Sequence, residues 1–347
     1  MKEPRPFTKD ILKETLNNIK VGFPVISRNI SMFPIEKQES SNLKYLDFTE
    51  QVNLGTVKVR ELNDLGSVPQ LALENSNSLP VFILDGEHLS GAKQNRTVNL
   101  SILVPPKTSM KIPVSCVEEG RWAHTSEHFF SEGELHFNRG RRLKARNIAR
   151  SLKDRLSRNV DQGEVWDAIR EKERIMQSRS NTHSMKEIYN KNIEQLDFFE
   201  RKIEPTPKQV GALYAIGPKI LGFDIFDQTK TLKQHIRKLT RSVAIDALED
   251  LKDSSKRPSL DEVKEFIDSF LALEVDNYPA IGLGTDVRAY NQHLTLSALE
   301  YDRCCVHLAG FSVQSNDRGS RLRRENFYRS AEIKNYLIPL DKWKMIC

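Results

Sequence analysis

The order of apolar and polar residues predicts β-structure in the first third of the chain, from about residue 43 to 118. In the stretch 97–104, Val98, Leu100, Ile102 and Val104 occupy alternate positions, as a strand with one buried face requires. Turn-forming residues separate this run from its neighbours. We expect an antiparallel sandwich or barrel, with strands at 52–59, 70–73, 81–84, 98–104 and 110–117.

The apolar spacing becomes helical from about residue 140 to 203, where we expect three helices. The first carries a single apolar stripe from Leu143 to Leu156. The second and third begin with capping pairs, Asp161 with Glu164 and Ser184 with Glu187, which can satisfy free N–H groups at a helix start. The segment 204–207 contains two prolines and ends the helical region.

The last third of the chain contains both strand-like and helix-like spacing of apolar residues. A β-hairpin is expected at 210–226 around Gly217-Pro218-Lys219, followed by one helix that ends near Leu251 and another opened by Ser259 and Glu262. Strand character returns at 281–290, 294–299 and 304–311. This order predicts an antiparallel sheet with helices packed on one face.

The fold class expected from these patterns is α+β. It combines an N-terminal β-sandwich-like domain, a helical middle segment and a C-terminal antiparallel sheet. The expected divisions are an N-terminal extension (1–42), the β-rich domain (43–138), the helical segment (139–204), the α+β domain (205–312) and a C-terminal tail (313–347).

The composition is that of a soluble cytoplasmic protein. The chain has 347 residues, 29% of them charged, and four cysteines without C-x-x-C spacing, which fits reduced thiols in a cytosol. No uncharged apolar run approaches the roughly 18–20 residues that a membrane span needs. We therefore expect no membrane association.

The net charge of +6 comes from one predicted helix. Residues 139–158 hold nine Lys or Arg and a single acid, Asp154. If most of these cations face outward, the helix is a candidate surface for nucleic-acid or scaffold binding. Nucleic acid would bind through Arg141, Arg142, Lys144 and Arg146. The alternative is a solvated face, or one paired with acids such as Glu164 and Glu171 in the next helix.

The segment 85–96 is too polar for a simple connection between two apolar strands, and we expect it to form a polar loop. It contains two carboxylates, two cations and two amides, namely Asp85, Glu87, Lys93, Gln94, Asn95 and Arg96. These groups can recognise a ligand through charge and directed hydrogen bonds. The alternative is that Asp85 and Glu87 pair with Lys93 and Arg96 and only fix a long hairpin.

A second polar cluster, which contains Glu118, Arg121 and Trp122, follows the next strand. If the two segments are adjacent, they form a positive, aromatic-edged site for an anionic, nucleotide-like small molecule. Arg96 and Arg121 would hold phosphate, and Trp122 would stack on a base or ribose. Gln94 and Asn95 would read ring or sugar edges.

Catalysis by the same segment is the alternative to simple binding. Asp85 or Glu87 would act as a general base in a hydrolase that cleaves a glycosidic or phosphate linkage. Standard catalytic signatures are absent from the sequence, and Gly282-Leu283-Gly284 fits a tight turn. We expect neither a metal nor another cofactor, because no convincing ligand set surrounds His124, Glu127, His128 and His136.

Several short motifs between residues 84 and 122 occur together in a recognisable order. They are Leu84-Asp85-Gly86-Glu87, Gly91-Ala92-Lys93-Gln94-Asn95-Arg96, Val104-Pro105, Ile112-Pro113-Val114-Ser115-Cys116-Val117-Glu118 and Gly120-Arg121-Trp122. With these motifs the sequence resembles the prokaryotic ADP-ribosylglycohydrolase- and rhodanese-phosphatase-associated protein family. The resemblance covers most of residues 40–312 and implies a role in NAD-derived nucleotide metabolism or prokaryotic defence.

Overall fold

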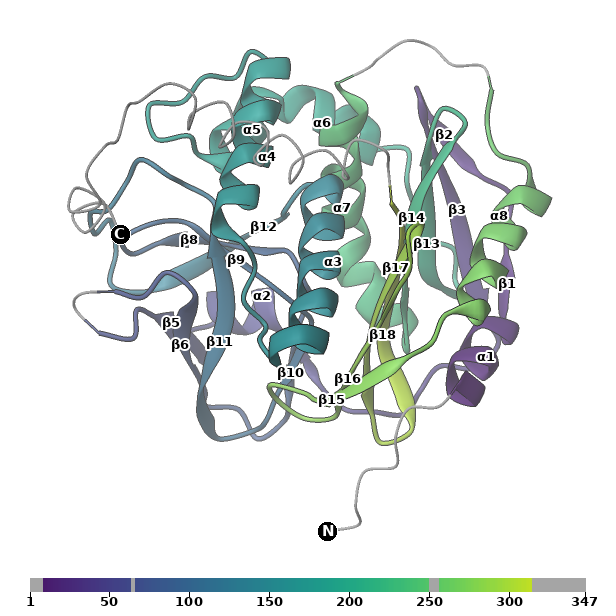
Figure 1. The fold of residues 1–347 in the computed structure, drawn as a ribbon, viewed down its shortest axis with the longest axis horizontal. Coiled ribbons are helices and arrows are strands. Elements are labelled where there is room, and N and C mark those ends of the chain that lie inside the picture. The colour runs from purple at the N-terminus through teal and green to yellow at the C-terminus, as the bar shows by residue number, and fades with distance from the viewer. Residues whose placement is uncertain (1–8, 64–65, 250–255, 314–347) are drawn as a thin grey trace, which may run out of the picture. The chain divides into compact units, whose positions relative to one another are not determined.

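A nine-stranded sheet and a closed six-stranded barrel form the frame of the fold (Figure 1). The computed structural model describes residues 9–63, 66–249 and 256–313. Their mixed helix and strand content confirms the expected α+β class. Residues up to Ser312 belong to one compact unit, and the expected boundaries at 42/43, 138/139 and 204/205 fall inside it.

The nine-stranded sheet is antiparallel and gathers strands from both ends of the sequence. The hairpin expected at 210–226 lies in it and is confirmed, as are the strands expected at 294–299 and 304–311. Its strands, in spatial order, are β1 (Ile19–Val21), β3 (Ile30–Lys37), β13 (Gln209–Ile216), β14 (Lys219–Phe226), β18 (Cys304–Ser312), β17 (Leu294–Tyr301), β16 (Thr285–Tyr290) and β15 (Asp276–Pro279), while β2 (Val25–Ser27) pairs with β3.

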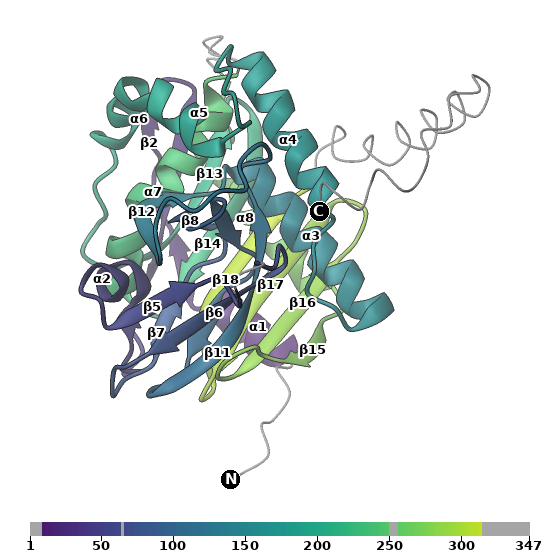
Figure 2. The same ribbon diagram turned by 90° about the vertical axis from the view of Figure 1, so that its left-hand side faces the viewer.

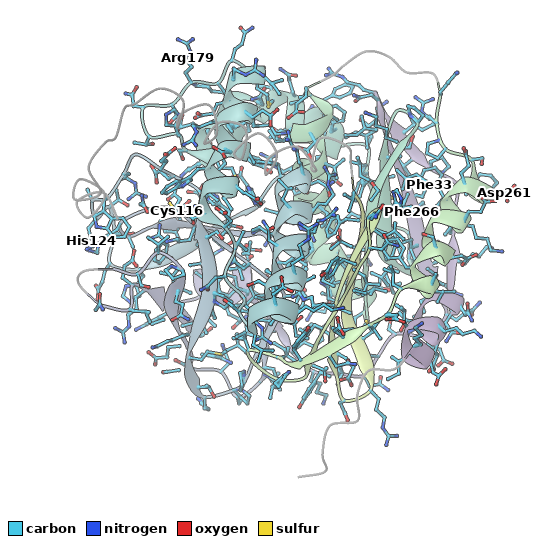
Figure 3. All side chains as sticks on the ribbon, viewed as in Figure 1. Phe33, Cys116, His124, Arg179, Asp261 and Phe266 are labelled. Carbon is cyan, nitrogen blue, oxygen red and sulfur yellow. The ribbon has the colours of Figure 1, made fainter. Side chains whose placement is uncertain are left out.

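Helices cover both faces of this sheet, so the expectation of helices on one face is wrong. Phe33 and Ile35 pack in a core with α1 (Lys9–Asn17), α8 (Leu260–Asp268) and η1 (Ser269–Ala272), whereas Met32 lies in the core on the other face. Figure 3 labels Phe33 of the sheet and Phe266 of α8 on the first of these sides. The difference arises because apolar residues occupy neighbouring positions of the central strands, as Met32 and Phe33 do in β3, which buries both faces.

Of the two β-architectures expected for this region, sandwich or barrel, the structure has the barrel. The predicted strand 98–104 breaks after Val98, because its first part joins the barrel and its second part joins a separate three-stranded sheet. The barrel consists of β11 (Thr108–Cys116), β6 (Gln70–Asn75), β5 (Val57–Arg60), β12 (Phe129–Leu135), β8 (Glu87–Gly91) and β9 (Arg96–Val98). The small sheet consists of β10 (Ile102–Val104), β7 (Val81–Ile83) and β4 (Leu46–Asp47), and α2 (Phe48–Asn53) occupies the start of the predicted strand 52–59.

Two helices, α3 (Asn138–Arg155) and α7 (Thr229–Ala247), lie between the barrel and the large sheet. Figure 2 shows the same arrangement from the barrel side. The helical segment continues as α4 (Gln162–Ile175), α5 (Met185–Lys191) and α6 (Ile193–Glu200). The predicted caps are confirmed at Asp161, which accepts from two backbone N–H groups, and at Ser259, which forms a full capping box with Glu262.

The segment expected as an N-terminal extension contributes β3, which pairs with β13 in the large sheet. Leu251 and residues 314–347, most of the expected C-terminal tail, lie outside the described residues. None of the helices in the described ranges is long and apolar enough to cross a membrane.

Candidate functional site

The polar segment 85–96 is buried β-structure, and the expectation of an open polar loop is wrong. It forms most of β8 and the start of β9, joined by a short turn, and every residue from Val81 to Leu100 is buried. Burial of so many polar groups requires partners for them. These partners come from segments far away in the sequence.

Asp85 binds an arginine at the centre of the molecule. Arg141 of α3 donates through Nε and Nη2 to the two oxygens of Asp85, over 3.0 and 2.9 Å. The same guanidinium donates through Nη1 and Nη2 to Asp224 of β14, over 3.1 and 2.6 Å. All three side chains are buried, so one arginine joins the barrel to the large sheet.

His307 of β18 extends this cluster. Its Nε2 lies 3.1 Å from Asp224 Oδ1, and its Nδ1 lies 2.9 Å from the hydroxyl of Ser101. The backbone N–H of Asp85 donates to the same hydroxyl over 3.0 Å. Burial opposes ionisation of the carboxyl groups, but the charge of Arg141 outweighs it and lowers the pKa of Asp85 and of Asp224. Nothing in the sequence links these distant residues.

Glu87 is held by a second cation. Lys238 of α7 donates to both carboxylate oxygens over 2.9 Å, and the hydroxyls of Thr49 and Ser131 donate to Oε1. The carboxylates of Asp85 and Glu87 therefore do not pair with Lys93 and Arg96 within a hairpin, which was the alternative expected from the sequence. All four of their oxygens accept hydrogen bonds within the protein.

The basic helix 139–158 faces inward over much of its length, so the expectation that most of its cations face outward is wrong. Arg141, Arg142 and Lys144 are buried, and Lys144 donates to Thr97 Oγ1 over 2.8 Å and to the carbonyl of Val98 over 2.9 Å. These three side chains cannot reach a nucleic acid in this conformation. The remaining candidate, Arg146, is half-buried.

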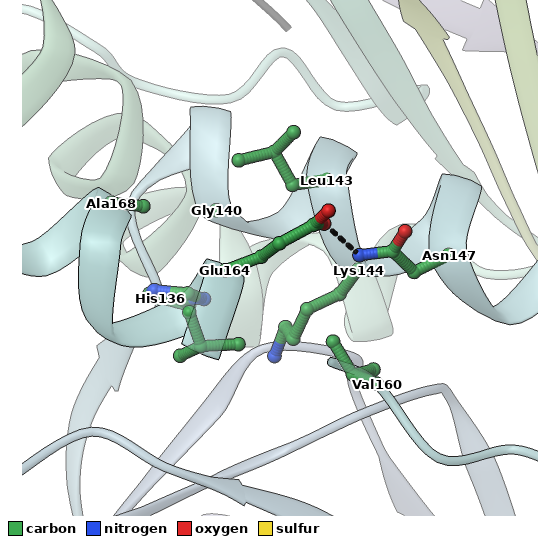
Figure 4. A pocket seen from close by; sticks show the side chains of 9 residues that line it. His136, Gly140, Leu143, Lys144, Asn147, Val160, Glu164 and Ala168 are labelled. Atoms are coloured by element: carbon green, nitrogen blue, oxygen red, sulfur yellow. Dashed lines mark hydrogen bonds between the residues drawn. The ribbon is translucent and has the colours of Figure 1, made fainter. Parts of the chain in front are cut away.

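Pairing with the next helix, the alternative considered for this basic segment, is confirmed at one residue. Arg139 lies 2.8 Å from Glu171 of α4. A pocket of about 10 Å³ beside Lys144 separates α3 from α4, where Asn147 donates to Glu164 over 2.7 Å (Figure 4). This space has room for about one water molecule. Burial lowers the pKa of Lys144 to about 7.

A different part of the predicted site is accessible, at Trp122. Its side chain is 46% exposed, and two cations of the other polar segment lie at its ring. Lys93 Nζ is 5.4 Å from the ring centroid and Arg96 Cζ is 5.7 Å from it, within cation–π range. The structure therefore brings the segments 93–96 and 118–122 together.

Arg96 is 0% exposed and has unused hydrogen-bond donors. Its Nη1 donates to the backbone and side-chain oxygens of Gln94 over 3.2 and 3.0 Å, but Nε and Nη2 have no hydrogen-bond partner among the described residues. Glu61 lies 3.8 Å from Nη2, and both of its oxygens are likewise without a hydrogen bond. Arg96 and Glu61 thus form a buried ion pair in which two donors and two acceptors make no hydrogen bond to a described residue, and Arg96 lies beside Trp122.

Cys116 completes the buried side of this region. Its thiol donates to the side-chain oxygen of Gln94 over 3.1 Å, and burial raises its pKa. The thiol is thus a protonated hydrogen-bond donor that orients Gln94. In Figure 3 Cys116 lies inside the structure, whereas His124, in the segment after Trp122, lies at its edge.

Arg121 holds the two segments together. It donates to Glu118 over 2.8 Å, to Asn95 Oδ1 over 3.0 Å and to the carbonyl of Ala92 over 2.7 Å. Additional acceptors in the surrounding loop leave none of its nitrogens without a partner. The phosphate-binding role predicted for Arg121 is therefore less suited to this geometry than a positioning role. Glu118 and Asn95 are likewise used within the protein, since Glu118 Oε2 also accepts from the Asn95 backbone over 3.2 Å.

Comparison with known proteins places the chain in a family. A search of curated proteins and a search of solved structures each found no match. One family model matches residues 18–311, most of the sequence, in agreement with the resemblance seen in the motifs. The chain belongs to the family of the ARG and Rhodanese-Phosphatase-superfamily-associated Protein domain.

Proposed function

We propose that the protein binds an anionic, nucleotide-like small molecule derived from NAD or ADP-ribose, at the site formed by Lys93, Arg96, Trp122 and Glu61. The observation that carries the proposal is the exposed Trp122 ring with two cations beside it. An exposed aromatic face attracts a planar base through stacking. Positive charge beside it favours a phosphorylated ligand over a neutral one.

The geometry favours a division of roles among these residues that differs from the one expected from the sequence. Arg96 offers two donors and Glu61 offers two acceptors at one place. This combination complements a group that both donates and accepts, such as a sugar hydroxyl pair or a carboxamide, because a phosphate would meet the charge of Glu61. We therefore propose that Lys93 binds the phosphate and that Trp122 stacks on the base. Arg96 and Glu61 would bind the sugar hydroxyl pair or the carboxamide.

The family supports the same ligand class by association. Its description names the ARG and rhodanese-phosphatase superfamilies, and the resemblance described above implies a role in NAD-derived nucleotide metabolism. This support is associational, because a shared fold does not by itself define a function. The proposal therefore depends on a direct binding measurement.

Isothermal titration of the full chain with ADP-ribose, NAD and cyclic ADP-ribose tests the proposal. We expect saturable binding of at least one of them, and we expect Trp122→Ala to weaken it by roughly 10- to 100-fold, the effect of one lost base stack. Phe23→Ala is the matched control, because Phe23 is an 82% exposed aromatic residue between β1 and β2. Absence of binding, or equal binding by the Trp122 variant, would refute the site.

Chromatography of the same mixtures distinguishes binding from hydrolysis. A pure binding protein leaves the ligand intact after prolonged incubation. Turnover that Glu87→Gln abolishes would establish the hydrolase alternative instead. The contacts of Glu87 with Lys238 favour the first outcome, because both carboxylate oxygens already accept from this buried ammonium group and a general base must reach the proton that it abstracts.

A further inference from the structure

An irregularity in β12 surrounds one buried histidine of β8 with carboxylates. Ser131 pairs with Leu89 and Leu135 pairs with Glu87, so the three residues 132–134 lie opposite His88 alone. Gly133 has φ +77° within this bulge, a conformation that glycine adopts without strain. A bulge of this kind redirects side chains and is common beside functional sites. Here it gathers Glu132 and Glu134 at His88.

His88 is 0% exposed, and neither ring nitrogen has a hydrogen-bond partner among the described residues. A buried imidazole normally uses at least one of its nitrogens. An imidazole whose nitrogens take part in no hydrogen bond keeps a lone pair available for coordination. A neutral imidazole of this kind is a ligand for a metal ion.

The carboxylates lie close to the imidazole and to each other. His88 Nδ1 is 3.8 Å from Glu134 Oε2, which has no hydrogen-bond partner in the described part of the chain. One donor atom from each of His88, Glu132 and Glu134 lies within 4.8 Å of the other two. Ligands of a tetrahedral zinc ion are about 3.4 Å apart, given bonds of about 2.1 Å. Small side-chain rotations therefore suffice to bring the three donor atoms around one ion.

We propose that His88, Glu132 and Glu134 form a binding site for a divalent transition-metal ion of the Zn²⁺ type. One imidazole nitrogen and two carboxylate oxygens are a donor set that Zn²⁺ accepts, with water as the fourth ligand. The partial exposure of Glu132 gives the ion a route from solvent. The site is separate from the Trp122 site and does not depend on the function proposed there.

Two cations of the surrounding helices lie beside the carboxylates of this site. Lys186 of α5 forms an ion pair with Glu132, and Arg241 of α7 lies 3.7 Å from Glu134 Oε1. Arg241 also binds Asp197 and Glu200, so it can remain in place when the ion enters. Lys186 has to release Glu132. The ion therefore competes with Lys186 for this carboxylate.

Titration of the metal-free full chain with ZnCl₂, and with CoCl₂ as a spectroscopic probe, tests the site. We expect one ion per chain and a visible absorption band from bound Co²⁺. His88→Leu and Glu134→Gln should each abolish the band. Lys186→Met should raise the affinity by roughly tenfold, because one like charge beside the ion is removed; a merely structural role for these residues predicts no such gain.

The matched control is the double variant His124→Ala, His128→Ala, which removes two histidines near the surface. This variant should keep the site intact. Circular dichroism establishes that each variant is folded, and Glu134→Gln preserves the test if His88→Leu does not fold. Absence of saturable binding, or binding that survives both site variants, overturns the proposal, as does loss of binding only in the His124 and His128 variant.

Discussion

Two buried clusters in this protein have the same composition, one histidine and two carboxylates, and opposite electrostatic states. In the first, Asp85, Asp224 and His307 surround Arg141, whose guanidinium donates to both carboxylates. In the second, Lys186 pairs with Glu132 and Arg241 lies near Glu134, but His88 makes no hydrogen bond to any described residue. The pKa of Asp224 is lowered, whereas burial raises the pKa of Glu134 to about 7.

The difference teaches that donor identity alone does not define a metal site. Both sets satisfy the distance requirement for a common ion. In the first, an arginine already occupies the position that a metal ion would take. The second keeps lone pairs without partners, which is unusual for buried polar atoms. Counting the partners of each donor therefore distinguishes a structural ion cluster from a candidate binding site.

Removal of Arg141 should have the largest effect on stability. Arg141→Met leaves Asp85 and Asp224 buried without their counter-charge, and we expect it to lower the free energy of unfolding by about 3–5 kcal/mol. Arg150→Met, at an exposed position of the same helix, is the control and should change it by less than about 0.5 kcal/mol. Urea unfolding of both variants measures the difference. Equal stability of the two would show that the central cluster contributes little.

Replacement of the two histidines compares the clusters directly. His307→Leu removes the contacts to Ser101 and Asp224 and should cost about 2–3 kcal/mol, because a buried carboxylate loses a partner. His88→Leu in metal-free protein removes no hydrogen bond and should change stability by less than about 1 kcal/mol. Thermal or urea unfolding in the presence of a chelator provides the test. A larger loss for His88→Leu than for His307→Leu would contradict the comparison.

Acid should weaken the first cluster. The pKa of Asp224 is about 2 in the folded protein, below its ordinary value of 3.8, and the pKa of Asp85 is lowered in the same direction. The stabilisation is therefore complete above about pH 5 and is lost as the pH falls toward 2, by about 2 kcal/mol for Asp224. Urea unfolding between these pH values measures it. Wild-type protein should lose more stability than Arg141→Met over this interval.

Local elements of the fold are predictable because their signals lie within short stretches of sequence. The hairpin around Gly217-Pro218-Lys219 has its turn residues between two apolar runs, and the helix opened by Ser259 and Glu262 carries its own cap. The strand predicted at 98–104 failed for the opposite reason. Its alternation is regular, but its two ends pair with different sheets, which is a property of the surroundings.

The candidate site was predictable only in part. The polar character of 85–96 and 118–122 indicates that these segments have a special role, and their proximity is confirmed through Arg121 and Asn95. The sequence does not show that every side-chain nitrogen of Arg121 donates a hydrogen bond. Nor does it show that Nε and Nη2 of Arg96 make none to a described residue. It also does not show the bulge that places Glu132 and Glu134 around His88.

The sequence by itself determined the α+β class, the family and the segments in which polar groups concentrate, because composition, period and motif are local properties of the chain. Only the tertiary structure determined which charged side chains form ion pairs with one another. The nine cations of 139–158 look like a basic surface in sequence, yet Arg141 and Lys144 face the interior. An ion pair between residues 56 or 83 positions apart is set by packing of the barrel, the helices and the sheet, and no local pattern encodes it.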